Sequence, residues 1–151
     1  MSRACVVSWS GGKDSTLVLH RLTRGRFSVE PSGRGEAAGS EVDVVGLLTM
    51  FSPETGTSRS HGLPRELLER QAAAWGLPLH AAAASWADYE VVFKDLVRDL
   101  VVQGIEVVAF GDIYLDDHRR WVERVCAEVG AEAVEPLWGQ DTGELAREVL
   151  D

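Results

Sequence analysis

The segment Ser8-Trp9-Ser10-Gly11-Gly12-Lys13-Asp14-Ser15 decides the fold, because it joins a short apolar run to a helical pattern through two glycines. The run 4–8 predicts the first strand, and the periodicity that follows predicts a helix over 14–23. Adjacent glycines permit a tight turn and let backbone N–H groups approach an anion closely. The segment therefore predicts a strand, a tight turn and a helix, an arrangement that binds phosphate in many α/β proteins.

Polar and charged side chains in this turn favour a polyphosphate as its ligand. The hydroxyls of Ser10 and Ser15 supply hydrogen-bond donors, the helix N-terminus supplies partial positive charge, and Lys13 supplies a full charge. A Walker A loop is excluded, since Val7 stands where its first glycine is needed and Asp14 stands where Ser or Thr is needed. The alternative interpretation is a strand–helix turn whose serines only cap the helix.

Outward from this segment, strand-like runs alternate with helical patterns, which is typical of a parallel sheet covered by helices. Further strands are expected over 42–50, 79–83, 105–110 and 131–134, and further helices over about 64–75, 85–103 and 142–150. Another helix is expected from the stripe Val122, Val125, Cys126 and Val129, and Gly130 closes it. Residues 27–40 are rich in Gly, Ser, Pro and Glu without periodicity and predict a flexible surface loop. We expect one domain over 1–151, an α/β fold in three layers whose open parallel sheet has about five strands and helices on both faces.

Aromatic and apolar side chains at helical spacing are expected to build the core. In the helix that begins near Pro64, the spacing predicts a buried stripe of Leu67, Leu68, Ala72 and Trp75. Four tryptophans are interpreted as core or boundary aromatics, namely Trp9, Trp75, Trp86 and Trp121.

Composition excludes several classes of protein. The formal net charge of −9 argues against a general nucleic-acid binder, because affinity for the phosphate backbone comes from Lys and Arg. No apolar run approaches the roughly 20 residues of a membrane span. Cys5 and Cys126 lie in apolar or helical patterns and are interpreted as reduced, buried thiols. We therefore expect a cytoplasmic protein with no nucleic-acid or membrane partner.

The whole chain resembles the diphthine–ammonia ligase family, and its glycine turn resembles the SGGxDS pyrophosphate-binding loop of the N-type ATP pyrophosphatases. The segments that carry the resemblance are Leu48-Thr49, Ser60-His61-Gly62, Tyr89-Glu90, Gly111-Asp112-Ile113, Arg119 with Glu123, and Pro136-Leu137-Trp138. The resemblance implies a Rossmann-like fold of the adenine nucleotide α-hydrolase type, with ATP and Mg²⁺ as cofactors.

Site residues follow from the same resemblance. It implies a nucleotide site formed by Ser8, Ser10, Gly11, Gly12, Lys13, Asp14, Ser15, Leu48, Thr49, Met50 and Gly111. It implies catalytic roles for Lys13, Asp14, His61 and Asp112, with Mg²⁺ held by Asp112. It implies substrate contacts from His61, Gly62, Glu90, Arg119, Glu123 and Trp138.

Several of these residues also have simpler interpretations. His61 can be a solvated loop histidine, and Asp112 can cap the helix that follows it. Arg119 and Glu123 are four apart on a predicted helix and can form a surface ion pair. Glu90 can simply favour the helix dipole, and Trp138 can pack on the core.

The function that the resemblance implies is an ATP-dependent, AMP-forming amide ligase. Its partners would be ATP, ammonia and a carboxylate substrate such as a modified protein side chain, and a homodimer is compatible with the sequence. Neither cysteine has the setting of a nucleophile, so free ammonia is the expected nitrogen donor. Two alternatives stay open, another AMP-forming enzyme acting on a small carboxylate and a non-catalytic ATP-binding module. We also expect this chain to lack the C-terminal segment with which family members help form the acceptor site.

Overall fold

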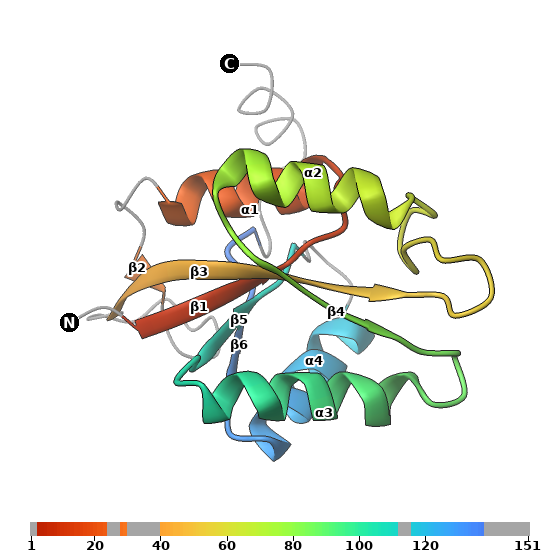
Figure 1. Ribbon diagram of the computed structural model, residues 1–151. Helices are drawn as coiled ribbons and strands as arrows, with labels where there is room; N and C mark the ends of the chain where they lie inside the picture. The colour runs from red at the N-terminus through yellow and green to blue at the C-terminus, as the bar shows by residue number, and fades with distance from the viewer. Residues whose placement is uncertain (1–2, 24–27, 30–39, 112–115, 138–151) are drawn as a thin grey trace.

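A computed structural model describes residues 3–23, 28–29, 40–111 and 116–137. In these ranges the chain forms one sheet between two layers of helices (Figure 1). The parallel strands lie in the order β4-β3-β1-β5-β6, with bounds Leu79–Ala83, Ser40–Phe51, Arg3–Ser8, Val107–Ala109 and Glu132–Val134. The expected three-layer fold with five parallel strands is confirmed.

A sixth, short strand departs from the expectation for residues 27–40. Ser28–Val29 forms β2 and pairs antiparallel with Ser40 and Glu41 at the start of β3. The prediction of a structureless loop was therefore wrong at its two ends, because backbone pairing with β3 extends the sheet there. Residues 30–39 and the predicted helix over 142–150 lie outside the described residues.

Two helices cover each face of the sheet. In Figure 1, α1 (Lys13–Thr23) and α2 (Arg65–Trp75) lie on one side, and α3 (Tyr89–Val102) and α4 (Asp116–Glu128) lie on the other. Side chains from each pair of helices meet a different set of strand residues, so the protein has one hydrophobic core above the sheet and one below it.

The central strand β1 shows why the sequence folds in this way. Cys5 and Val7 point into the core of α1 and α2, while Val6 points into the core of α3 and α4, and all three are fully buried. A strand that is apolar on both faces suits the interior of a parallel sheet that helices cover on both sides. The apolar run at 4–8 therefore fixes β1 at the centre of the sheet.

The strand order places the switch point of the sheet beside β1. The chain proceeds from β1 to β3 on one side, and it returns to form β5 on the other side. In open α/β sheets the ligand crevice lies at such a point, beyond the carboxyl ends of the strands. The glycine loop that follows β1 lies at this edge.

The buried stripe of α2 is narrower than the sequence predicted. Leu68 and Ala72 are buried as expected, but Leu67 and Trp75 are exposed. Leu67 lies about 100° around the helix from Leu68, and Trp75 is the final residue of the helix. The helix therefore packs through one row of small and medium side chains.

Both cysteines are free and buried, as expected. Burial raises the pKa of the Cys5 thiol and of the Cys126 thiol to about 12, so neither is ionised near neutral pH. Among the described residues, no helix has the length and apolar character needed to cross a bilayer.

Two valines of α3 test the packing of the second core. Val97 is 0% exposed and Val102 is 83% exposed. Val97→Ala should lower the free energy of unfolding by about 2 kcal/mol, because it removes two buried methyl groups and leaves a cavity. Val102→Ala makes the same chemical change in solvent and should alter it by less than about 0.5 kcal/mol. Urea unfolding measures both values, and equal losses would contradict the described packing of α3.

Candidate functional site

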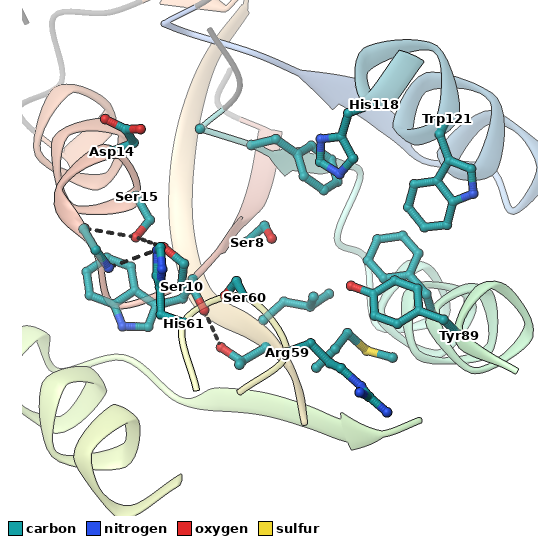
Figure 2. Close-up of a pocket in the computed structure, with 18 of the residues that line it drawn as sticks. Ser8, Ser10, Asp14, Ser15, Arg59, Ser60, His61, Tyr89, His118 and Trp121 are labelled. Atoms are coloured by element: carbon teal, nitrogen blue, oxygen red, sulfur yellow. Dashed lines mark hydrogen bonds between the residues drawn. The ribbon is translucent and has the colours of Figure 1, made fainter. Parts of the chain in front are cut away.

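A cavity of about 530 Å³ opens at the carboxyl ends of β1, β3 and β5. Figure 2 shows Ser10, Ser15 and His61 on one side of it and Tyr89, His118 and Trp121 on the other. Its lining comes from the glycine loop, the end of β3, the segment 59–61, the two residues after β5, and the first two turns of α3 and α4. The residues are Ser8, Trp9, Ser10, Gly12, Lys13, Asp14, Ser15, Leu48, Thr49, Met50, Arg59, Ser60, His61, Tyr89, Phe93, Phe110, Gly111, His118 and Trp121.

Hydrogen bonds within the glycine loop fix its shape. The Gly12 N–H donates to Ser10 Oγ at 3.2 Å, and the hydroxyls of Ser10 and Ser15 lie 3.0 Å apart. The Ser15 hydroxyl also lies 3.2 Å from the Gly12 carbonyl oxygen, which accepts from it, and the Thr16 N–H donates to the same carbonyl at 3.2 Å to begin α1. Ser10 thus accepts from the amide that precedes α1, and Ser15 donates to a carbonyl at the start of that helix, so these bonds shape the loop and both serines line the cavity. The helix-capping bonds of the simpler interpretation are not among them.

The two glycines of the loop do different work. Gly11 has φ of +82°, and a β carbon there would lie 2.8 Å from Leu63 Cδ1 and 2.9 Å from Leu68 Cδ2. Gly11 therefore faces α2, and it shapes the turn without lining the cavity. Gly12 does line the cavity, and a β carbon there would lie 2.8 Å from His61 Nε2. His61 thus packs directly on the loop.

Backbone and side-chain bonds around Trp9 tie the loop to the sheet. The Trp9 N–H donates to the Leu48 carbonyl at 2.7 Å, and the buried Thr49 hydroxyl donates to the Trp9 carbonyl at 2.6 Å. The Trp9 indole N–H donates to Gln71 Oε1 on α2 at 2.9 Å. These three bonds hold the beginning of the loop between β3 and α2.

Lys13 and Asp14 pair with each other at the mouth of the cavity. Lys13 Nζ lies 2.8 Å from Asp14 Oδ1, and both side chains are solvent-accessible. An exposed ion pair of this kind contributes at most about 1 kcal/mol, so an incoming phosphate can compete for the lysine. Gly111 closes against this turn, because a β carbon there would lie 3.3 Å from Asp14 Cβ. A side chain at residue 111 would press on the start of α1, so glycine favours the close approach of this turn to the residue after β5.

The structure brings the predicted residues of the glycine loop other than Gly11, together with those of β3, His61 and Gly111, into one cavity, but it leaves other candidates outside. Gly62 has φ of +64° and completes the turn that carries His61, yet it does not line the cavity. Arg119 Nε lies 3.0 Å from Glu123 Oε1 and 3.7 Å from the buried Glu135 Oε2. The simpler interpretation of Arg119 and Glu123 as an ion pair is therefore what the structure shows. Asp112 and Trp138 lie outside the described residues.

Glu90 belongs to an ion-pair network that joins α3 to α4. Its carboxylate accepts from Arg124 at 2.7 Å, from Lys94 at 2.9 Å and from the Trp121 indole N–H at 3.0 Å. Hydrogen bonds from Arg124 and Lys94 lower the pKa of Glu90 to about 2. Its charge is thus neutralised inside the network.

Sequence reasoning missed the aromatic side of the cavity. Phe93 lies 6.3 Å from Tyr89, 5.4 Å from Trp121 and 6.3 Å from Phe110 between ring centroids. Trp9, Arg59, Ser60 and His118 also line the cavity without having been predicted to do so. Helical spacing made the rings of α3 and α4 look like core residues. The available signal was proximity to predicted residues, since Trp9 lies between Ser8 and Ser10, Arg59 and Ser60 precede His61, and Tyr89 precedes Glu90.

A second chamber of about 550 Å³ adjoins the first. It is lined by Arg59, Ser60, Trp86, Tyr89, Glu90, His118 and Trp121. All of these except Trp86 and Glu90 also line the first cavity, so the two chambers share a wall of side chains. Glu90 therefore faces this second chamber.

Glu90→Gln should destabilise the protein at neutral pH and lose that effect in acid. The folded-state pKa of about 2 lies below the ordinary value of 4.5, so the charge stabilises the folded state above about pH 4.5. This contribution fades as the pH falls toward about 2. Urea midpoints of the parent and Glu90→Gln proteins should differ at neutral pH and converge as the pH falls toward about 2, while the exposed control Glu54→Gln should leave the midpoint unchanged at both pH values. A difference independent of pH would contradict the ionic role of Glu90.

Comparison with known proteins identifies the family of this chain. The family model described as the diphthamide synthase N-terminal domain matches residues 36–133, which is more than half of the 151 residues. The match runs from before β3 into β6. It therefore contains His61, Gly111 and the helices α3 and α4, whose rings line the cavity, but it does not contain the glycine loop. No curated protein matched the chain. The resemblance that the motifs indicated is confirmed, and the chain belongs to the diphthamide synthase N-terminal domain family.

Proposed function

We propose that this chain binds ATP in the first cavity and uses it to join ammonia to a carboxylate, forming an amide, AMP and pyrophosphate. The observation that carries the proposal is the placement of the glycine loop, where Ser10, Gly12, Lys13 and Ser15 line one cavity at the switch point of the sheet. The family match supports it, since the family is described as a diphthamide synthase domain.

The loop fits the triphosphate of ATP. The serine hydroxyls and the N-terminal amides of α1 offer donors, and the Lys13 ammonium offers a mobile positive charge. The carboxyl end of β3, at Leu48, Thr49 and Met50, lines the same cavity and would receive the adenine. The nucleotide would then lie across the ends of β1 and β3.

The reaction would proceed in two displacements. One carboxylate oxygen of the acceptor forms a bond to the α phosphorus, and the bond to the bridging oxygen of the β phosphate breaks, so that pyrophosphate leaves with the electron pair. Ammonia then forms a bond to the acyl carbon, AMP leaves with the electrons of the C–O bond, and the nitrogen loses a proton. Positioning and charge neutralisation by the site would lower both barriers.

Named residues would serve these steps. Lys13 and the loop amides would stabilise the charge on the departing pyrophosphate, and His61, packed on Gly12, would donate a hydrogen bond to a phosphate oxygen. Neither Cys5 nor Cys126 lines the cavity, and burial raises the pKa of both thiols. A thiol nucleophile is therefore not available for releasing ammonia from an amide, which supports free ammonia as the donor.

Mg²⁺ fits the donors present at the loop. In nucleotide sites this ion is held by one or two carboxylates together with phosphate oxygens and water. Asp14 provides a carboxylate that lines the cavity beside Lys13. It would hold the ion together with Asp112, the Mg²⁺ ligand that the family resemblance implies. The ion would supply charge neutralisation for the phosphates. Within the described ranges, no three His, Cys, Asp or Glu side chains gather to hold a metal by themselves.

The nucleotide product tests this function directly. The protein is incubated with ATP, Mg²⁺ and ammonium, together with a diphthine-bearing protein or a panel of small carboxylates, and the products are separated by chromatography. AMP and pyrophosphate should form only when an active acceptor and ammonium are both present. ADP as the product would contradict the mechanism, and tight ATP binding without turnover would favour the non-catalytic module.

Lys13→Ala should weaken ATP binding at least tenfold, because a charge-assisted hydrogen bond to phosphate contributes roughly 1.5–3 kcal/mol. Calorimetric titration with ATP and Mg²⁺ measures the change. Arg98→Ala removes an exposed positive charge from α3, away from the loop, and should leave the affinity unaltered. Equal affinities of the Lys13→Ala and parent proteins would remove Lys13 from the site.

A further inference from the structure

Arg59 stands where the two chambers meet, because it lines both of them. Its guanidinium carbon lies 4.7 Å from the centre of the Trp86 ring, and its Nε donates to the Ala84 carbonyl at 2.9 Å. Its backbone N–H donates to the Met50 carbonyl at 3.0 Å. Arg59 is thus fixed at three points, and Figure 2 shows its side chain below the cavity, on the side of Tyr89.

The charge of Arg59 has no counterion in the described part of the chain. The ion pairs in that part join other residues, and the Nε contact to a carbonyl is the hydrogen bond that its side chain makes. Glu90 faces the same chamber, but Arg124 and Lys94 already neutralise its carboxylate. The chamber therefore presents one fixed cation whose terminal N–H groups are available to a ligand.

Aromatic rings form the walls around this cation. Trp86 and Tyr89 stack with centroids 5.4 Å apart, Tyr89 lies 5.9 Å from Trp121, and His118 stacks on Trp121 at 6.2 Å. Trp86 remains 68% exposed, so one wall of the chamber offers a large apolar face to solvent. A planar guanidinium beside open aromatic faces suits a carboxylate that is attached to a flat or apolar body.

We propose that Arg59 binds the carboxylate of the acceptor and that Trp86, Tyr89 and Trp121 hold the flat or apolar body to which that carboxylate is attached. This inference rests on the proposed function, since it assigns the acceptor subsite of that reaction. The first cavity contains the phosphate loop and the second adjoins it through Arg59, so the bound carboxylate would face the nucleotide. Arg59 would thus make the substrate contact that the family resemblance implied for Arg119, whose guanidinium pairs with Glu123 and lies near Glu135.

Three probes of one shape and different charge test the subsite on the full chain. Phenylacetate, phenylacetamide and phenethylamine are titrated without ATP and followed by saturation-transfer NMR. Phenylacetate should bind at least tenfold more tightly than phenylacetamide, because only the carboxylate forms charge-assisted bonds with the guanidinium. Phenethylamine should bind most weakly. A preference for phenethylamine would overturn the proposal.

Arg59→Gln should weaken phenylacetate binding at least tenfold and leave phenylacetamide binding unchanged, with ATP affinity retained. Arg98→Gln is the matched control and should leave the affinities for phenylacetate, phenylacetamide and ATP unchanged. Trp86→Ala should weaken both phenylacetate and phenylacetamide, because it removes an aromatic wall that both probes contact. Unchanged phenylacetate affinity in Arg59→Gln, or a loss of ATP affinity alone, would overturn the assignment.

A second variant guards against a folding defect. Arg59→Lys keeps the charge and most of the stem but cannot form a planar bidentate pair, so its phenylacetate affinity should lie between those of the parent and Arg59→Gln. If Arg59→Lys unfolds at the parental temperature but binds phenylacetate as weakly as Arg59→Gln does, then the charge of residue 59 does not bind the carboxylate and the proposal is contradicted.

The subsite and the proposed function can fail separately. If the protein prefers phenylacetate, and this preference depends on Arg59, but no acceptor yields AMP, then the ligase function is contradicted and the subsite is supported. If Arg59→Gln forms AMP at the parental rate, then the ligase function is supported and the assignment of the acceptor subsite to Arg59 is contradicted.

Discussion

The site depends on how Trp9 is held at the end of the central strand. Its N–H donates to Leu48 and its carbonyl accepts from Thr49, at 2.7 and 2.6 Å, so both backbone groups of Trp9 are bound to β3. Because β1 is buried on both faces and pairs with β3 and β5, the glycine loop begins from a point that cannot move without breaking the sheet. A loop anchored in this way presents its amides and hydroxyls in one arrangement before any ligand arrives.

The two sides of the cavity are built from different chemistry. The glycine loop gives polar groups, namely the Ser10 and Ser15 hydroxyls and the Gly12 N–H, that hydrogen-bond to one another. The opposite side is a group of aromatic rings from α3, α4 and Phe110, which follows β5. The network of Glu90 with Arg124 and Lys94 joins the two helices that carry most of these rings. We infer that the polar side serves the nucleotide and the aromatic side serves the acceptor, with Arg59 at the boundary.

Much of the fold could be predicted, because its signals are local. The apolar run of β1, the glycines at 11 and 12, and the helical spacing of α3 each act within a few residues. The predictions were wrong where contacts between distant segments decide the local structure. Ser28 and Val29 become a strand only because β3 offers backbone partners, and Leu67 stays exposed because α2 packs through the row of Leu68 and Ala72. Around the cavity, His61 and the predicted loop residues other than Gly11 are in the lining. Arg119, for which a substrate contact and an ion pair were both open, pairs with Glu123 and lies near the buried Glu135.

The sequence alone determined the order of strands and helices, the glycine turn after the first strand and the family to which its motifs point. Only the tertiary structure decided that Arg59, thirty residues or more from the rings of α3 and α4, shares a chamber with Tyr89 and Trp121. The reason is physical. Turns and helices follow from interactions between neighbours in the chain, while a pocket wall is set by the pairing order of the strands, which brings the ends of distant segments to one edge of the sheet.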